Sequence, residues 1–522
     1  MKHRFEKRLA AIAAASRGAL QGGLKGVEKE SLRIGSDGFL SPKAHPATLG
    51  SALTNRYITT DFSEALLEFV TPTFSTTWES LQCICDIHQF TYSQLDEEIL
   101  WSASMPCLIP SDADIPLARY GSSNVGRMKT IYRRGLGHRY GRQMQVIAGV
   151  HFNYSLPKEF WPLYQQVLGI DHEADQFQSD QYLGLIRNFR QMGWLVLYLF
   201  GASPALCKSF AGAAAAGLKL LNADTYFEPH GTSLRMSDLG YSNQNQSKIN
   251  ISLNSLKEYV DDLSTAIRTP EPAYEEIGVK VDGHYRQLNA NLLQIENEFY
   301  SPVRPKRVAK SGEQPTAALR RDGIEYVEIR SLDINPYDPS GINQNTMRFI
   351  EAFLIYCLLE DSPKLDDAAL TEISRNHTET AKNGRDPDFL LLRNDRPVTL
   401  RAWASEIVSN VLAVAEVIDA NDASQSYADS VRLMQKLVEH PEETPSARML
   451  ADLEESQCSF FEYAFGQAKS HSDYFASITP LDEARRVVFE KEAAESLTRQ
   501  QAIEALDDIS LDDYLQRYFS NY

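Results

Sequence analysis

Alternating apolar and polar side chains in four short segments constrain the fold of this chain more than any other feature of its sequence. The segments are residues 26–34, 145–155, 293–300 and 324–331. In the second segment, a strand would place Phe152 on one face and His151 and Asn153 on the other. The polar faces are rich in Glu, His, Asn and Gln, whereas a solvated strand face would prefer Thr and Lys. We therefore expect strands whose polar faces line a pocket.

The ends of these segments carry Gly and Pro, as expected where strands feed loops around a pocket. An antiparallel sheet with one solvated face would show the same alternation, and the residue types on the polar face argue against that alternative. The expected fold class is α+β. A curved antiparallel sheet packs its outer face on helices, and its inner face forms a funnel-shaped active site.

The pattern of apolar and turn-forming residues changes near residue 360. Before this point, Gly, Pro, Asn and Asp separate short alternating segments, which is typical of a sheet with long functional loops. After it, residues 403–420 and 481–505 are acidic stretches with the apolar period of helices. We expect a catalytic region over residues 1–360 and a mainly helical C-terminal region over residues 361–522, packed on the first as one globular unit.

Charge and composition exclude several classes of partner. The 522 residues include 70 acidic and 52 basic side chains, a formal net charge of −18, whereas a nucleic-acid binder draws its affinity from Lys and Arg. No apolar run approaches the roughly 20 residues that span a membrane, and residues 1–18 are predicted to form an amphipathic helix instead of a signal peptide. Six irregularly spaced cysteines favour reduced thiols. We expect a cytoplasmic protein with no nucleic-acid or membrane partner.

Eight motifs extend the argument from residue types to a family. They are GLKGVEKESLRI (23–34), YITTDFSEALLEFVTP (57–72), RYGSSNVGRMKTIYRRGL (119–136), GVHFNYSLP (149–157), LFGASPALC (199–207), TSLRMSDLGYSN (232–243), LQIENEFYSPVRPKR (293–307) and GIEYVEIRSLDINP (323–336). In these motifs and in their order the chain resembles the bacterial glutamate–cysteine ligases of the proteobacterial type, and behind them the glutamine synthetase-like carboxylate–amine ligases. Eight long motifs in order are far more specific than any single short pattern.

The resemblance implies a glutamine synthetase-like catalytic region and a particular reaction. ATP would phosphorylate the γ-carboxylate of L-glutamate, because a carboxylate needs a better leaving group before it can form an amide. The γ-glutamyl phosphate would then react with the amine of L-cysteine to give γ-glutamylcysteine, ADP and phosphate, in the first step of glutathione biosynthesis. The expected partners are these three small molecules, and the expected assembly is a monomer or a small homo-oligomer.

Six side chains are the metal ligands that the resemblance implies. They are Glu28, Glu30, Asp61, Glu68, His151 and Glu328. Without cations these carboxylates would repel one another, because two unit charges ~4 Å apart interact by ~4 kcal/mol at an effective dielectric constant of about 20. Oxygen ligands select Mg²⁺, and a single imidazole makes Mn²⁺ tolerable as well. The resemblance implies two or more ions. Glu30, Asp61 and Glu68 would bind one ion beside the amino-acid substrates. The remaining three ligands would bind another ion on the nucleotide phosphates.

Two arginines are the candidate catalytic residues. Arg330 follows Glu328 by two positions on the same strand face, and its guanidinium can bridge the transferred phosphoryl group with two parallel hydrogen bonds. By the resemblance, Arg235 grips the α-carboxylate of glutamate, and Gly149 belongs to the substrate site. The expected nucleotide contacts are Asn153, Ser155, Lys306, Arg307 and Arg330.

An aromatic pocket is the expected device for selecting cysteine. Phe62, Tyr132, Tyr241 and Tyr300 occupy the positions that line the cysteine pocket of the family. Aromatic rings make favourable contacts with sulfur, and tyrosines suit a pocket that is half apolar and half wet. Core packing is the alternative for each ring.

Two other functions agree with parts of the sequence. A carboxylate–amine ligase with a different amine acceptor would need the same metal and phosphate groups. A catalytically silent binding or regulatory protein could keep the scaffold, but such proteins usually lose metal ligands or the phosphate arginine, and all of these residues are present here. ADP release with cysteine, alanine or ammonia as acceptor separates the three possibilities.

Overall fold

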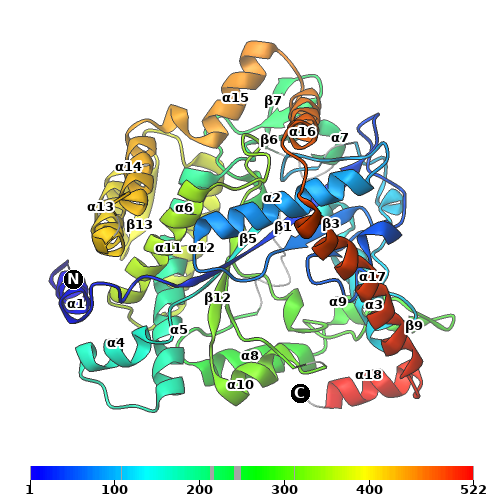
Figure 1. Ribbon diagram of the computed structural model, residues 1–522, viewed down its shortest axis with the longest axis horizontal. Coiled ribbons are helices and arrows are strands. Elements are labelled where there is room, and N and C mark those ends of the chain that lie inside the picture. The colour runs from blue at the N-terminus through cyan, green and yellow to red at the C-terminus, as the bar shows by residue number, and fades with distance from the viewer. Residues whose placement is uncertain are drawn as a thin grey trace.

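A curved antiparallel sheet forms the centre of the computed structural model, which describes residues 2–106, 108–211, 217–239, 249–310, 312–421 and 423–520. Among these residues, the sheet has seven strands in the order β11-β12-β5-β1-β3-β2, with β4 paired to one end of β1 (Figure 1). The strands are β1 (Leu24–Ile34), β2 (Ile58–Thr60), β3 (Leu66–Val70), β4 (Ile99–Leu100), β5 (Val150–Ser155), β11 (Val303–Lys306) and β12 (Tyr326–Leu332). The expected α+β class and antiparallel sheet are confirmed.

Three of the four alternating segments form strands of this sheet. Residues 26–34 lie in β1 and residues 324–331 overlap β12, whereas only the second half of residues 145–155 is extended, in β5. The first half contains a 3₁₀ turn, η3 (Gln143–Val146).

The fourth prediction, a strand over residues 293–300, is wrong. This segment holds the 3₁₀ turn η7 (Glu296–Glu298), and the strand β11 begins only at Val303. Its polar side chains accept hydrogen bonds from nearby backbone N–H groups instead of lying on the face of a paired strand. The Leu288 N–H donates to Gln294 Oε1 at 2.9 Å, and the Gln294 N–H donates to Glu298 Oε2 at 2.7 Å. Side chains that satisfy nearby N–H groups in this way compete with strand pairing.

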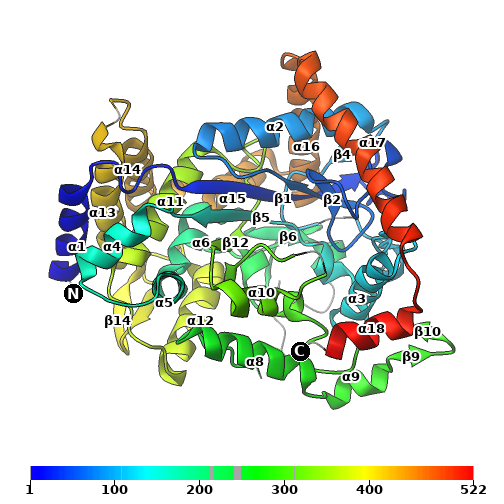
Figure 2. The same ribbon diagram turned by 60° about the horizontal axis from the view of Figure 1, so that its bottom comes forward.

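The outer face of the sheet is apolar and carries helices, as expected. Val27, Phe152 and Ile329 are fully buried on this face, in one core with Phe349 and Phe353 of α11. In Figure 2, α2 lies above β1, and α3 and α10 lie on the opposite side of the sheet. The helices up to residue 360 are α1 (Lys2–Ala15), α2 (Thr77–Gln94), α3 (Asn124–Tyr140), α4 (Phe160–Leu168), α5 (Ala174–Met192), α6 (Trp194–Phe200), α7 (Lys208–Ala211), α8 (Leu256–Arg268), α9 (Pro272–Ile277), α10 (Pro315–Asp322) and α11 (Gln344–Leu359).

The first helix is amphipathic, as its sequence predicts. Phe5, Leu9 and Ile12 of α1 are buried at intervals of four and three residues, which places them on one helix face. Among the described residues, three small sheets lie outside the main one. They are the sheet of β6 (Ala205–Cys207), β7 (Lys219–Asn222) and β8 (Thr225–Phe227), the hairpin of β9 (Lys280–Val281) and β10 (His284–Tyr285), and the hairpin of β13 (Leu390–Arg393) and β14 (Arg396–Thr399).

The region after residue 360 is mainly helical, and many of its buried residues belong to the same core as the sheet. Val411 of α13 and Leu354 of α11, for example, are both fully buried members of that core. The elements of this region are α12 (Asp367–Asn383), β13 (Leu390–Arg393), β14 (Arg396–Thr399), α13 (Leu400–Ile418), α14 (Ser426–Glu439), α15 (Pro445–Ser456), α16 (Phe460–Ser477), α17 (Glu483–Ala505) and α18 (Leu511–Ser520). The boundary at residue 360 stays a prediction.

Two further expectations concern cysteines and membranes. Cys83, Cys85, Cys357 and Cys458 are free thiols, but Cys207 is disulfide-bonded, so the prediction of reduced thiols is wrong at that position. Spacing along the chain does not show which cysteines the fold brings together. Among the described residues, no helix has the length and apolar character needed to cross a bilayer.

Candidate active site

A cavity of about 590 Å³ opens on the polar face of the sheet, between the strands and α3. Most of the predicted site residues line it. They are Glu28, Glu30, Asp61, Phe62, Glu68, Tyr132, His151, Tyr300, Lys306, Glu328 and Arg330. The inner face of the sheet therefore forms the wall of a polar cavity, as its alternating segments indicate.

Strand register brings the charged side chains together from distant parts of the chain. Glu28 of β1 pairs with His151 of β5, and Glu30 of β1 pairs with Glu68 of β3. On the other side of β5, Asn153 pairs with Glu328 of β12. Residues directly opposite each other in an antiparallel ladder share a face and are close neighbours. Four strands thus supply five of the six predicted metal ligands, and Asp61 follows β2.

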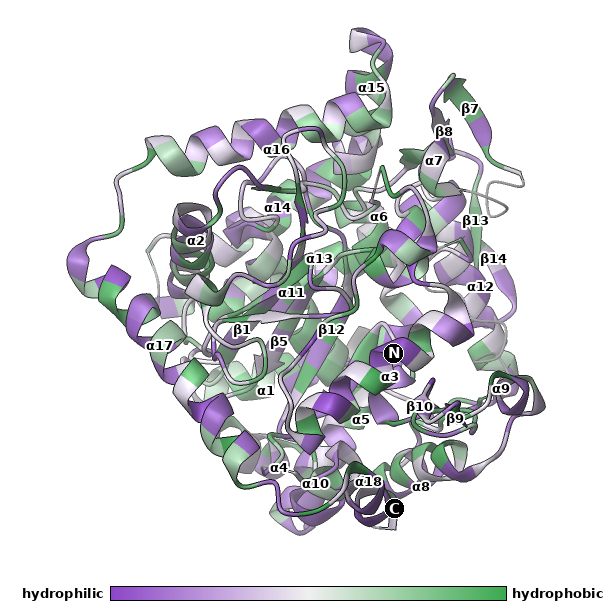
Figure 3. Cartoon of the chain, turned by 90° about the vertical axis from the view of Figure 1, so that its right-hand side faces the viewer, coloured by the Kyte–Doolittle hydropathy of each residue, from purple (hydrophilic) through white to green (hydrophobic). Residues whose placement is uncertain are grey.

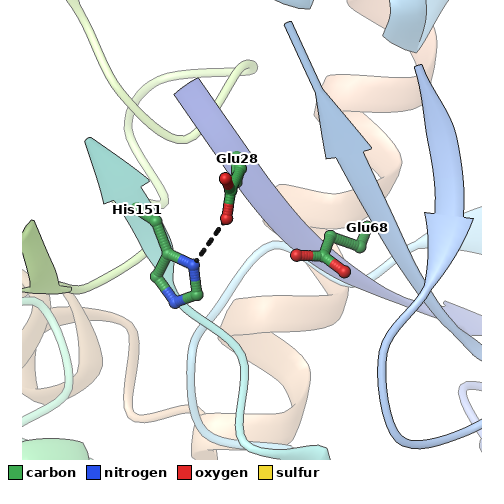
Figure 4. Close-up of side chains that lie close together, drawn as sticks. All are labelled: Glu28, Glu68 and His151. Atoms are coloured by element: carbon green, nitrogen blue, oxygen red, sulfur yellow. Dashed lines mark hydrogen bonds and ion pairs between the residues drawn. The ribbon is translucent and has the colours of Figure 1, made fainter. Parts of the chain in front are cut away.

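The predicted metal ligands converge around one imidazole. His151 Nδ1 lies 3.1 Å from Glu28 Oε2 and 3.6 Å from Glu328 Oε1, and its Nε2 lies 3.9 Å from Glu30 Oε1. One ligand atom each from Glu28, Glu68 and His151 lies within 4.8 Å of the others. Figure 4 shows these three side chains pointing toward one another from β1, β3 and β5. All six predicted ligands therefore share one cavity.

Positive charge compensates the carboxylates near Asp61 only in part. Burial raises the pKa of Glu68 well above its ordinary value, and the charges of Glu28, Asp61 and Glu30 raise it further. Burial likewise raises the pKa of Glu30, although His151 opposes the shift. This half of the cluster needs a proton or a cation to relieve the repulsion.

The other half of the cluster is already supplied with positive charge. Burial favours a higher pKa for Glu328, but Lys306, Arg330 and His151 outweigh it and hold the pKa of that carboxyl well below its ordinary value. Burial also acts on Glu28, whose pKa is nevertheless lowered, mainly by its hydrogen bond with His151. Glu28 and Glu328 are therefore ionised and ready to act as ligands.

Arg330 and Lys306 both contact Glu328 at the edge of the cavity. Arg330 Nη1 donates to Glu328 Oε1 at 2.9 Å, and Lys306 Nζ lies 3.4 Å from Glu328 Oε2. Burial alone would lower the pKa of Arg330, but Glu328, Glu30 and Glu28 raise it above its ordinary value. Two fixed cations beside an ionised carboxylate form a suitable binding place for phosphate oxygens.

Arg235 lies behind the cavity wall instead of lining it. Its guanidinium is buried, with Nη1 3.5 Å from Asp333 Oδ1 and Nη2 donating to the carbonyl of Arg330 at 2.9 Å. Gly149 makes this position accessible, since a Cβ built there would lie 2.0 Å from Arg235 Nη2. The Gly149 N–H in turn donates to Glu30 Oε2 at 2.7 Å. The two residues adjoin the carboxylates but do not appear in the surface of the cavity.

Three predicted nucleotide contacts also lie outside that surface. Asn153 Nδ2 donates to Glu28 Oε1 at 2.9 Å, so Asn153 orients a predicted ligand. Ser155 lies at the end of β5, paired with Leu24. Arg307 Nη1 lies 3.7 Å from Asp322 Oδ2, and Arg307 Nε donates to the carbonyl of Gly323.

Apolar and aromatic side chains also line the cavity. Phe62, Tyr132 and Tyr300 of the predicted cysteine pocket are there, with the Tyr300 hydroxyl 3.2 Å from Met236 Sδ. Tyr241 lies outside the described residues. The cavity wall also contains Met128, Leu136, Met144 and Ile295, which the sequence did not single out.

Several basic residues of the cavity were also missed. Lys129, Arg133 and Arg139 line it from α3, and Arg304 from β11. Arg133 Nη2 lies 3.8 Å from Asp61 Oδ1, and burial together with Arg133 lowers the pKa of Lys129 to about 8. Tyr132, Arg133 and Leu136 follow Lys129 by three, four and seven positions, so a search for a helical period in residues 119–136 would have found this part of the face.

Comparisons with known proteins agree with one another. Residues 9–380 match the family model described as glutamate-cysteine ligase. A glutamate–cysteine ligase of Alcanivorax borkumensis is 48% identical over 525 residues, covering 99% of this chain and 100% of that protein. One of Pseudomonas putida is 46% identical over 481 residues, covering 92% of this chain and 91% of that protein.

Solved structures show the same fold. A glutamate–cysteine ligase from Francisella tularensis in complex with AMP superposes with a TM-score of 0.90 at 35% identity, covering 96% of this chain and 98% of that chain. A bifunctional glutathione synthetase from Pasteurella multocida superposes with a TM-score of 0.74 at 23% identity, covering 93% of this chain and 58% of that chain, and supports the fold alone.

Proposed function

The chain belongs to the glutamate–cysteine ligase family, and we propose that its reaction takes place in the cavity on the polar face of the sheet, with the residue roles given below. The reaction is the ATP-dependent ligation of glutamate to cysteine, which forms γ-glutamylcysteine for glutathione synthesis. The observation that supports the location is the convergence of all six predicted metal ligands in one cavity.

The donor set fits divalent cations. Five carboxylates and one imidazole line the cavity, and burial, followed by the neighbouring carboxylates, raises the pKa of Glu68. Hard oxygen donors of this kind bind Mg²⁺, with Mn²⁺ as an alternative. Glu30, Asp61 and Glu68 would hold one ion, and Glu28, His151 and Glu328 another. When bound, the ions neutralise phosphate charge and orient the reacting groups.

Arg330 and Lys306 are proposed to bind the transferred phosphoryl group. An oxygen of the glutamate γ-carboxylate attacks the γ-phosphorus of ATP, the bond to the bridging β,γ-oxygen breaks, and ADP leaves. Phosphoryl transfer needs positioning and charge neutralisation from the protein more than covalent help. The AMP complex of the Francisella tularensis relative supports a nucleotide site in this fold.

The second half of the reaction is proposed to occur against α3. The cysteine nitrogen attacks the acyl carbon of γ-glutamyl phosphate, the bond from that carbon to the phosphate oxygen breaks, and the nitrogen loses a proton. Phe62, Tyr132 and Tyr300 would surround the cysteine side chain, as their positions in the cavity allow. Arg235, held beside Glu30 and Gly149, would position the α-carboxylate of glutamate.

The test is ADP release from ATP and Mg²⁺ with glutamate plus one of three acceptors. Cysteine should give rapid release, and alanine and ammonia much slower release. Equal rates with all three acceptors would replace the proposed specificity by that of a general carboxylate–amine ligase. No release with any acceptor would overturn the proposed function.

Glu328→Gln provides the matched test of the site. The substitution keeps the shape of the side chain but removes the charge that Lys306 and Arg330 face, so turnover should fall about 100-fold or more. Wild-type turnover in this variant would contradict the role of the cavity. Glu325→Gln is the control. Glu325 directly precedes β12, and among the described contacts its carboxylate accepts a hydrogen bond only from the Val308 N–H, so this variant should retain activity.

A further inference from the structure

A C-terminal strap, residues 483–520, runs along one side of the molecule and ends beneath α3. It consists of α17, a short turn and α18, which follow one another along the edge of the view in Figure 1. Hydrophilic and hydrophobic residues alternate in short patches along α17, as expected of a helix at the surface (Figure 3). Two of the segments that the strap contacts reach the cavity.

The first of these segments is the start of α3. Glu504 Oε1 accepts from the Ser122 N–H at 2.7 Å, and Asp507 Oδ2 accepts from the Asn124 N–H. Asn124 Nδ2 donates to the carbonyl of Ile509 at 3.0 Å. The first N–H groups of a helix have no partner within the helix, and carboxylates there are also favoured by the helix dipole. The strap therefore caps α3 from outside its own sequence.

The back of α3 packs on the last helix of the strap. Leu511 and Leu515 are one helical turn apart in α18, and both are buried in a cluster with Met128 and Ile131 of α3 and with Ile295. Met128 and Ile295 line the cavity on their other side. One layer of side chains thus separates α18 from the cavity.

The second segment leads into β2 and Asp61. The Ser51 N–H donates to Ser496 Oγ at 2.9 Å, and the Arg56 N–H donates to Glu492 Oε1 at 2.9 Å. The backbones come close enough that a Cβ built on Gly50 would lie 2.8 Å from the Cα of Ala493. Asp61 and Phe62, the next residues after β2, enter the cavity.

We propose that the C-terminal strap is a positioning element for the acceptor side of the active site. It holds α3 and residues 51–62 at the spacing at which Phe62 and Tyr132 enclose the incoming amine. The proposal rests on the proposed function, which assigns these two rings to cysteine.

The test is Leu515→Ala in the full-length chain. Loss of this side chain leaves a cavity beneath Met128 and Ile131, so α3 should shift or loosen. The apparent KM for cysteine should rise about five- to tenfold, while the KM values for ATP and glutamate stay within about twofold. Leu515→Met, which conserves volume, should restore the wild-type KM for cysteine.

Leu453→Ala in α15 is the matched control, because Leu453 is buried in the main core and does not belong to the cluster that joins α3 and α18. It should lower the melting temperature without changing the ratio of the three KM values. Asp507→Asn is a milder second variant that weakens only the cap of α3, and it should raise the KM for cysteine in the same direction if Leu515→Ala does not fold. Equal changes in all three KM values for both strap variants would overturn the proposal.

Hydrogen–deuterium exchange gives a readout that does not depend on the reaction. Leu515→Ala should increase exchange in residues 124–140 and leave residues 150–155 unchanged, and Leu453→Ala should change neither. Unchanged exchange in residues 124–140 would overturn the proposal. Increased exchange in a protein that makes no γ-glutamylcysteine would support the strap as a holder of α3 while refuting the proposed function.

Discussion

Gly149 has no side chain, and the guanidinium of Arg235 occupies the space where one would lie. Gly149→Ala would force Arg235 or the backbone bonded to Glu30 to move, and turnover should fall about 100-fold, as expected for a misplacement of about 1 Å in an active site. Steady-state kinetics with glutamate as the varied substrate measure the effect.

The control for this substitution is Gly26→Ala in β1. A Cβ at Gly26 would meet its nearest neighbour at 3.7 Å, an ordinary contact, so that variant should keep its activity. Full activity in Gly149→Ala would contradict the proposed role of Arg235 in positioning glutamate.

Proton release should accompany metal binding at Glu68. Its pKa is raised above the ordinary 4.5 by burial and by neighbouring carboxylates. A metal ligand must be ionised, so apparent metal affinity should rise as pH rises through the raised pKa. The stability of the metal-free protein should change in the opposite direction. The folded state holds the proton of Glu68 more tightly than the unfolded chain does, so the free energy of unfolding falls as the pH rises through the raised pKa.

Calorimetric titration of MgCl₂ into the metal-free protein, in two buffers of different ionisation enthalpy, measures the released proton. Glu68→Gln should abolish the part of the proton release that comes from the Glu68 carboxyl group. Glu28→Gln should weaken binding without removing that part, because the pKa of Glu28 is already lowered. Identical enthalpies in both buffers for the wild type would refute the prediction.

At the scale of elements, strands were more predictable than the loops and helix faces beside them. β1, β5 and β12 alternate apolar and polar residues, so the polar faces that carry Glu28 and His151 followed from the period. That these two residues share a site was expected only from the resemblance. Residues 293–300 alternate equally well, but Gln294 and Glu298 bond local N–H groups, which a pattern of residue types does not show. The basic face of α3 follows a helical period, which a match of motifs to a family does not reveal.

The contact between β1 and α11 contains a buried ion pair that sequence could not reveal. Lys25 Nζ and Glu351 Oε1 are 3.1 Å apart, although the residues are far apart in the chain, and both side chains are 1% exposed. Glu351→Leu leaves the ammonium without its carboxylate, so unfolding free energy should fall by about 3–5 kcal/mol. Thermal and urea denaturation measure the loss.

The double substitution Lys25→Met with Glu351→Leu should recover most of that stability, because it removes both charges. Arg4→Ala, which breaks a surface pair with Asp361 in which Arg4 is 73% exposed, should have almost no effect. Equal losses in the single and double variants would show that packing, not the unpaired charge, causes the destabilisation.

For the whole molecule, bound cations should add to stability, because the fold gathers like charges that the unfolded chain keeps apart. MgCl₂ at about 100 times its dissociation constant should stabilise the protein by about 2.7 kcal/mol and raise its melting temperature. NaCl at the same ionic strength is the control, since a net charge of −18 also responds to screening. Chelation should reverse the gain.

Glu68→Gln and Glu28→Gln should each reduce the specific effect of MgCl₂ on the melting temperature. A rise that NaCl reproduces fully would contradict specific binding. The total charge was available from composition, but the location of the acidic cluster depended on four strands drawn from residues 24 to 332, which only the topology brings together.

The residues of the C-terminal strap that cap α3 are synthesised long after α3 itself. Asn124 and Asp507 are 383 positions apart. A ribosome that adds about 5–20 residues per second therefore needs about 20–80 s after making the start of α3 before it makes the carboxylate that caps it. During that interval Ser123 still caps the Gly126 N–H. The Asn124 N–H and the apolar back face of the helix lack the partners that the strap supplies later, so this stretch is where a chaperone would be needed most.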